Sequence, residues 1–276
     1  MRTVFGYGDI ALFSGSGNPE LTQEISDYLK VPLNDYDLIE FPNENLFMRL
    51  HGSVRGKDVY LIQSMGPPVH RNIIEMLIMI DCLKRDSAGR ITAVFPYMAY
   101  ARSDKKDQPR VPIAARLVAD MIEVAGADRY ITIDLHAGQI QGFFSIPGDV
   151  LTAFHLLSDY FLAQPHENSV VATTDLGFAK KGRNFAEKLG VPQAFVEKRR
   201  VIDDPRAHAM QIIGDVQGKD VILVDDEVLT GSSIIEAAHI LKEHGAQNLK
   251  LSFTHALLVP PAAKNLTAID SITEIV

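Results

Sequence analysis

The chain has 276 residues, of which 46% are hydrophobic and 22% are charged, and its formal net charge is −8 at pH 7. This length predicts one large domain or two of ordinary size. The acidic balance argues against a generic nucleic-acid binder, so an anionic ligand has to be held by local basic clusters or a bridging metal ion. The single Cys82 cannot support a disulfide framework, which favours a reducing, cytoplasmic compartment. We expect no signal peptide, because the N-terminus lacks a basic segment followed by an uninterrupted apolar core, and no membrane span, because the apolar stretches are too short.

Apolar strands alternate with amphipathic helical segments along the chain. In chain order, strands are predicted at 58–65, 91–98, 129–135, 169–175, 220–226 and 249–258. The segment 112–126 has a helical period that ends at Gly126. Its predicted buried face consists of Ala114, Leu117, Val118 and Met121. Near-continuous apolar strands alternating with helices predict an α/β fold, with mostly parallel sheets flanked by helices.

The chain also contains an internal repeat. "VRGKDVYLIQSMGPPVHRNIIEMLIMI" (54–80) aligns with "VQGKDVILVDDEVLTGSSIIEAAHIL" (216–241). Both copies carry Gly-Lys-Asp-Val, an apolar strand, a loop, and Ile-Ile-Glu at the start of a helix. The repeat predicts two homologous α/β domains, 1–149 and 150–276. Because only the second copy carries two acids and several hydroxyls, those residues serve something other than the shared frame.

The second copy changes from strand to helix at "VDDEVLTGSS" (224–233). Ser233 and Glu236 have the spacing of a capping box, which predicts a helix that starts at Ser233. Free backbone N–H groups at a helix N-terminus suit a phosphate, and carboxylates accept hydrogen bonds from sugar hydroxyls. The loop therefore predicts a ribose 5-phosphate site, and a capped helix with an acidic turn remains the alternative. The predicted ligands are Asp225, Asp226, Thr230, Gly231, Ser232 and Ser233.

Four stretches resemble one known family. "VDDEVLTGSS" resembles the motif that binds phosphoribosyl pyrophosphate in type I phosphoribosyltransferases and ribose-phosphate pyrophosphokinases. "DLHAGQIQGFF" (134–144) resembles the signature of the pyrophosphokinases, "FPYMAYARSDKK" (95–106) their ATP-phosphate segment, and "VEKRR" (196–200) their catalytic loop. The chain is thus similar to the ribose-phosphate pyrophosphokinase family from about residue 10 onward, duplication included.

This resemblance implies a fold and an activity. The fold is two tandem phosphoribosyltransferase-like domains, the first on the ATP side and the second on the ribose 5-phosphate side. The activity is transfer of the diphosphoryl group of ATP to the 1-hydroxyl of ribose 5-phosphate, with Mg²⁺ as cofactor and AMP as a product, for nucleotide biosynthesis.

The resemblance makes Lys198 and Arg200, just after the apolar residues 194–196, the catalytic pair. Phosphoryl transfer depends on positioning and charge neutralisation, and an Arg and a Lys supply a bidentate contact and a mobile point charge. A solvated basic turn is the alternative. We expect the polar segment that follows, 201–210, to form a hairpin that closes over the substrates.

The remaining implied residues bind nucleotide and metal. The ATP-binding set is Phe41, Asn43, Asn45, Arg102, Ser103, Asp104, Lys105 and His136, and the Mg²⁺ set is His136, Asp134 and Asp175. An ordinary charged loop and a structural histidine are the alternatives. The 41–45 segment is the family's adenine-contact loop, which reaches a neighbouring subunit and so implies a homo-oligomer.

The chain departs from the family at some of these positions. The usual Phe-Ser-Asp-Gly-Glu is Phe-Pro-Asn-Glu-Asn at 41–45, and Leu229 replaces an acid of the ribose-phosphate motif. Three other functions therefore stay open: a phosphoribosyltransferase, a non-catalytic regulatory homologue, and a divergent synthetase that uses another donor or sugar.

Overall fold

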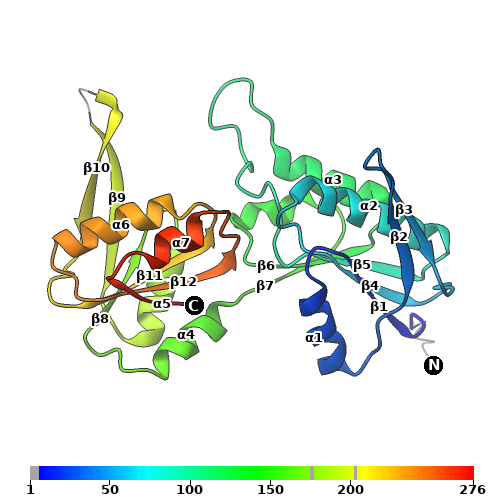
Figure 1. Cartoon of the computed structure of the whole chain (residues 1–276), viewed down its shortest axis with the longest axis horizontal. Helices are drawn as coiled ribbons and strands as arrows, with labels where there is room; N and C mark the ends of the chain where they lie inside the picture. Colours follow the sequence, from blue (N-terminus) through cyan, green and yellow to red (C-terminus); the bar gives the residue numbers. More distant parts are fainter. Residues whose placement is uncertain (1–5, 175–176, 202–203) are drawn as a thin grey trace. The chain divides into compact units, whose positions relative to one another are not determined.

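The computed structural model describes residues 6–174, 177–201 and 204–276, without the side chains of 197–210. The chain divides into two compact units, Met1–Leu151 and Thr152–Val276 (Figure 1). None of the helices in this described part has the length and apolarity needed to cross a bilayer.

The first unit is built on a parallel sheet of five strands in the order β1-β4-β5-β6-β7. Helices α2 and α3 pack on one face of this sheet and α1 lies on the other, while β2 and β3 form a separate antiparallel hairpin (Figure 1). Its elements are β1 (Ile10–Ser14), α1 (Pro19–Leu29), β2 (Tyr36–Glu40), β3 (Leu46–Leu50), β4 (Asp58–Ile62), α2 (Val69–Arg85), β5 (Arg90–Val94), α3 (Ala114–Ala125), β6 (Arg129–Ile133), the 3-10 helix η1 (Gly138–Phe143) and β7 (Gly148–Leu151).

The second unit has a sheet of six strands in the order β10-β9-β8-β11-β12-β13, parallel except for the β9–β10 pair. Alternate residues of its strands feed two cores: Val221 and Leu223 pack with α6, and Ile222 and Val224 with α4 and α5. Its elements are α4 (Phe154–Leu162), β8 (Ser169–Thr173), α5 (Ala179–Leu189), β9 (Gln193–Val201), β10 (Asp204–Ile213), β11 (Asp220–Val228), α6 (Ser232–Glu243), β12 (Leu249–Ala256), α7 (Ala262–Thr267) and β13 (Ile272–Ile275).

The two units share one topology. Strands β1-β4-β5-β6 of the first unit correspond to β8-β11-β12-β13 of the second, and each unit inserts a hairpin before the repeated strand. The repeated segments form β4 with α2 and β11 with α6, at the same topological position. Two α/β folds with parallel sheets flanked by helices are therefore confirmed.

Of the buried face predicted for α3, Val118 is confirmed, but the face as a whole is wrong. Gly126 ends the helix in a left-handed conformation, as predicted, but Leu117 is 58% exposed. Nine of the twelve α3 residues, in Ala114–Ala125, are apolar, so periodicity alone does not identify the side that faces the sheet. The buried residues are Ala115, Val118, Ala119 and Ile122.

In the first copy of the repeat, a neutral residue occupies the position that corresponds to a carboxylate in the second copy. Gln63 aligns with Asp225 and is fully buried. Its Oε1 accepts the N–H of Gly17 at 2.8 Å, and its Nε2 donates to the carbonyl of Asn72 at 3.2 Å. The strand-loop-helix fold is therefore common to both units, but in the first unit a neutral side chain forms hydrogen bonds to the backbone of the protein itself.

Gly17→Ala tests how tightly this first copy is packed. A Cβ at Gly17 would lie 2.4 Å from the carbonyl oxygen of Ser64, a backbone atom that cannot rotate away. We expect a loss of about 1–3 kcal/mol in the free energy of unfolding, measured by urea denaturation. Gly52→Ala is the matched control, because nothing lies within 4 Å of its Cβ position. Equal stability of the two variants would contradict this description of the packing.

Candidate functional site

The first unit brings two predicted ATP-side loops to one edge of its sheet. Strands β5 and β6 are parallel neighbours, with Val94 opposite Ile131, so the loops that follow them leave from the same edge. Gln139 Nε2 donates to Asp104 Oδ2 at 2.5 Å and joins the two loops. Arg102 and His136, one from each loop, are both exposed.

Two of the predicted ATP residues have structural roles in this loop. Ser103 holds the start of α3, since its Oγ accepts the N–H of Ala114 at 3.2 Å and its carbonyl accepts that of Ala115 at 3.1 Å. Asp104 is buried, at 7% exposure. Among the four predicted residues 102–105, Arg102 and Lys105 are therefore the ones that present charge to solvent.

Asp134 has an unusual backbone conformation. It follows β6 with a φ of +41°, in the left-handed region that non-glycine residues rarely adopt, and its N–H donates to the carbonyl of Leu151 at 2.9 Å. Such conformations concentrate at functional sites, where the surrounding structure maintains them. Asp134 thus shares a left-handed backbone with Glu44 and Tyr100, which lie in or next to the other predicted ATP-side segments.

Of the predicted metal set, Asp134 and His136 share this loop, while Asp175 lies outside the described residues. Within the described part of the chain, no group of three or more His, Cys, Asp or Glu side chains could hold a metal ion. Mg²⁺ keeps several waters and binds through one or two carboxylates plus substrate phosphates. Asp134, the one carboxylate of residues 134–147, could bind a hydrated ion of that kind.

The predicted adenine-contact residues form the tip of the β2–β3 hairpin. The N–H of Phe41 donates to the carbonyl of Asn45 at 2.9 Å, and Glu44 has a φ of +66°. Phe41, Asn43 and Asn45 are all exposed, with Phe41 at 46%. The tip therefore presents an aromatic face and amide groups to solvent.

In the second unit, Asp225 and Asp226 are strand residues. The strand predicted at 220–226 already includes both acids, and β11 continues two residues further, to Val228. Asp226 is buried, at 5% exposure, and Asp225 is half-buried. Asp225 Oδ2 accepts the hydroxyl proton of Thr174 at 2.7 Å, and its Oδ1 accepts the N–H of Asp226 at 2.8 Å. Thr174, which directly follows the neighbouring strand β8, is a contact that the sequence analysis missed.

The electrostatics of this pair are unusual. Burial raises the pKa of Asp225 to about 7, and the neighbouring Asp226 adds to the rise, while the hydrogen bond from Thr174 opposes it. A carboxyl with this pKa changes charge close to neutral pH. Hydrogen bonds from sugar hydroxyls would favour its charged form.

The predicted capping box at Ser233 is wrong. Helix α6 begins one residue earlier, at Ser232, and Gly231 precedes it with a φ of +73° and without a side-chain cap. Because the glycine is left-handed, it redirects the chain at this point, and a Cβ there would lie 3.2 Å from Leu266. The buried face of α6, predicted as Ile234, Ala237, Ala238 and Leu241, is confirmed.

The hydroxyl groups of the loop remain on the surface. Thr230, Ser232 and Ser233 are exposed, and the Oγ atoms of the first two lie 3.0 Å apart. They surround the N-terminus of a helix of twelve residues, Ser232–Glu243. This combination of hydroxyl donors and a positive helix end suits a phosphate.

Lys198 and Arg200 lie in a strand rather than in a turn after one. β9 runs through both residues, and the antiparallel ladder pairs Lys198 with Met210 and Arg200 with His208. Residue 201 and residues 204–210 therefore belong to the predicted hairpin. The side chains of Lys198 and Arg200 lie outside the described part of the chain.

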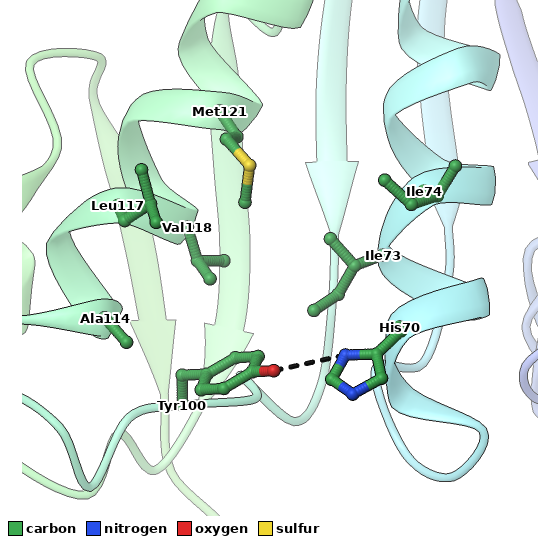
Figure 2. A pocket seen from close by; sticks show the side chains of 8 residues that line it. All are labelled: His70, Ile73, Ile74, Tyr100, Ala114, Leu117, Val118 and Met121. Carbon is green, nitrogen blue, oxygen red and sulfur yellow. Dashed lines mark hydrogen bonds between the residues drawn. The ribbon is translucent and has the colours of Figure 1, made fainter.

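A separate cavity of about 270 Å³ lies between α2 and α3 (Figure 2). Its wall includes the four α3 residues predicted as the buried face of that helix, but no predicted ligand-binding residue. Tyr100 and His70 meet there through a hydrogen bond. The lining residues are His70, Ile73, Ile74, Tyr100, Ala114, Leu117, Val118 and Met121.

Comparison with known proteins finds two family models. The N-terminal domain of ribose phosphate pyrophosphokinase matches residues 10–126, and the phosphoribosyl transferase domain matches residues 155–268. A ribose-phosphate pyrophosphokinase of Campylobacter jejuni is 45% identical over 93% of this chain and 83% of its own length. One from Chlorobaculum tepidum is 46% identical over 93% of this chain and 79% of its own length.

A solved structure agrees with these matches. The crystal structure of phosphoribosylpyrophosphate synthetase from Mycobacterium smegmatis has a TM-score of 0.92 and 40% identity, and the match covers 97% of this chain and 88% of that one. The likeness therefore extends over both units.

The raised pKa of Asp225 predicts a pH-dependent stability. The folded chain retains this proton up to about pH 7, whereas an unfolded aspartate releases it near 3.8, so stability falls as pH rises through this window. Asp225→Asn cannot ionise. We expect its free energy of unfolding, relative to the wild type, to become more favourable between about pH 5 and pH 8 in urea titrations.

The control for this experiment is Asp270→Asn, a change at an exposed aspartate of the same unit. Its stability relative to the wild type should stay nearly constant over the same range. An identical pH response of the two variants would show that Asp225 is ionised throughout.

Proposed function

Because the chain belongs to the ribose-phosphate pyrophosphokinase family, we propose that it transfers the β,γ-diphosphoryl group of ATP to the 1-hydroxyl of ribose 5-phosphate. The bond from the ribose oxygen to the β-phosphorus forms as the bond from that phosphorus to the AMP oxygen breaks, and the hydroxyl proton is released. The products are phosphoribosyl pyrophosphate and AMP.

The observation that carries the proposal is at the end of β11. A half-buried carboxylate, Asp225, stands there just before an exposed hydroxyl-bearing loop and the N-terminus of α6. The loop and the helix end would hold the 5-phosphate, and Asp225 would accept hydrogen bonds from the sugar hydroxyls. Because Asp226 is buried, we assign it to supporting Asp225 rather than to direct contact with the sugar.

The ATP side of the proposal rests on the first unit. Arg102 and Lys105 would bind the phosphates, and Phe41, Asn43 and Asn45 the adenine. Asp134, His136 and Asp175 would hold Mg²⁺, which neutralises phosphate charge when bound. The family resemblance assigns Lys198 and Arg200 to the transferring group, where a cation is needed as charge develops on the AMP oxygen.

We also propose a homo-oligomer that works in the cytoplasm. The exposed Phe41 on a hairpin tip supports the idea that this turn contacts a second copy. The single cysteine supports a reducing compartment such as the cytoplasm. We further propose that the protein has no nucleic-acid partner, because its net charge is negative.

One assay tests the activity. Purified protein is incubated with ribose 5-phosphate, Mg²⁺ and ATP, and AMP is measured over time. AMP formation that depends on ribose 5-phosphate is the expected result. If no AMP forms with any donor and sugar tested, the protein is a non-catalytic homologue and the proposal is wrong.

Lys198→Ala tests the catalytic assignment. A group that acts mainly in the transition state affects turnover more than substrate binding. We expect kcat to fall by about 100-fold or more, with a small change in KM for ribose 5-phosphate, whose proposed ligands lie on other elements. Lys264→Ala, at an exposed position on α7, is the control for loss of a positive charge. AMP release by Lys198→Ala at the wild-type rate would refute the assignment.

Ser232→Asp should give the opposite kinetic result. The new carboxylate would stand at the start of α6, where we place the 5-phosphate, and would repel it. We expect KM for ribose 5-phosphate to rise by about tenfold or more, while KM for ATP changes little. Ser232→Ala separates the added charge from the lost hydroxyl and should raise this KM less, and a KM for ribose 5-phosphate that Ser232→Asp leaves unchanged would contradict the phosphate placement.

A further inference from the structure

The first turn of α2 contacts two separate segments that we place on the ATP side. His70 and Arg71 are neighbours in this turn, which begins at Val69. Arg71 reaches Glu40, at the base of the hairpin tip, and His70 reaches Tyr100, at the start of the turn that leads to Arg102. These two segments are 60 residues apart in the sequence but meet the same end of one helix.

Arg71 joins the hairpin to the interior of the unit. Its Nε donates to Glu40 Oε2 at 2.9 Å, and Glu40 is the last residue of β2, directly before Phe41. On its other side, one terminal nitrogen donates to Glu75 Oε2 at 2.7 Å and to Ser16 Oγ at 2.6 Å.

Buried contacts fix the inner partner of this arginine. The side chain of Glu75 is 0% exposed, and its Oε1 also accepts the N–H of Ser16 at 2.7 Å. A planar guanidinium bound by such an anchor has little freedom left. Arg71 therefore offers Glu40 a fixed partner, and the hairpin tip begins at a defined point.

His70 holds the second segment from the same turn (Figure 2). Its Nδ1 lies 3.1 Å from the hydroxyl of Tyr100, and the two rings stack at 29° with centroids 6.2 Å apart. Tyr100 has a φ of +64°, and its carbonyl accepts the N–H of Ser103 at 2.8 Å, which closes the turn around Arg102. The histidine thus supports a left-handed residue two positions before that arginine.

We propose that this turn of α2 is a clamp, formed by the pairs Arg71–Glu40 and His70–Tyr100, that positions both nucleotide-binding segments of the first unit. Its four members are positioning residues, which set the location of the 41–45 tip and of Arg102 without contacting the nucleotide. The inference rests on the proposed function, because that function places ATP at these segments.

The internal repeat supports a specialised role for this turn. With Ile73 aligned on Ile234, Arg71 falls on Ser232 and Asn72 on Ser233. The helix start that offers exposed hydroxyls in the second unit therefore carries side chains that bind the protein's own loops in the first. A substitution in this turn should therefore weaken the binding of ATP and leave the binding of ribose 5-phosphate, which we assign to the second unit, unchanged.

Two conservative variants open the clamp without removing its anchor. Glu40→Gln weakens the contact with Arg71 but leaves Arg71 paired with Glu75, and Tyr100→Phe removes only a hydroxyl. Because exposed ion pairs and single hydrogen bonds are weak, we expect each variant to raise KM for ATP by about 3–10-fold. KM for ribose 5-phosphate should stay within about twofold of the wild type. Glu24→Gln and Tyr28→Phe, at exposed positions of α1, are matched controls that should change neither constant.

Amide hydrogen exchange of the substrate-free protein supplies a readout independent of activity. We expect faster exchange at 41–45 in Glu40→Gln and at 100–106 in Tyr100→Phe, with both controls like the wild type. If the wild type forms no AMP, the proposed activity fails and exchange alone decides whether the clamp exists.

Two results would overturn the clamp. The first is a rate of amide hydrogen exchange that stays at the wild-type value at both segments in the variants. The second, in an active enzyme, is an unchanged KM for ATP, or a rise in KM for ribose 5-phosphate equal to that for ATP. Either would mean that these contacts stabilise the unit without positioning the nucleotide segments.

Discussion

Parallel hydrogen bonding between neighbouring strands is the constraint on which both candidate sites depend. β5 and β6 run in the same direction in the first unit, as do β8 and β11 in the second, so loops from distant parts of the chain emerge at one edge of each sheet. Single hydrogen bonds then link neighbouring segments, from Gln139 to Asp104 between two loops and from Thr174, directly after β8, to Asp225 on β11. A different strand register would move the residues of one loop away from those of the other.

The acids of β11 show a conflict between folding and ligand binding. A half-buried carboxylate beside a second buried one is unfavourable when charged, which is why the pKa of Asp225 rises to about 7. The first copy of the repeat has a stable solution at the same position, since both the oxygen and the nitrogen of the neutral Gln63 amide form hydrogen bonds inside the protein. Keeping two carboxylates in the second copy thus carries a stability cost that a ligand with several hydroxyls can offset.

The same duplicated frame serves two purposes. In the second unit, the loop after the repeated strand is exposed and rich in hydroxyls, and α6 begins with little side-chain contact to the loop apart from Thr230 and Ser232. In the first unit, the equivalent helix start turns inward, with Arg71 bound to the buried Glu75 and His70 to Tyr100. Under the proposed function, the second copy binds a ligand with this helix start and the first copy uses it to hold its own loops.

The sequence by itself determined the α/β class, the duplication, the buried face of α6 and the family. These features depend on local periodicity and on linear motifs, both of which are present in the order of residues. Only the tertiary structure decided which side of the nearly all-apolar α3 faces the sheet, because packing chooses among apolar faces that the sequence presents equally. It also decided that Thr174 bonds to Asp225, that Ser103 holds the start of α3 and that Arg71 joins the hairpin to Glu75. Each of these depends on groups brought together by strand pairing and helix packing, and no pattern within a single segment specifies such contacts between distant ones.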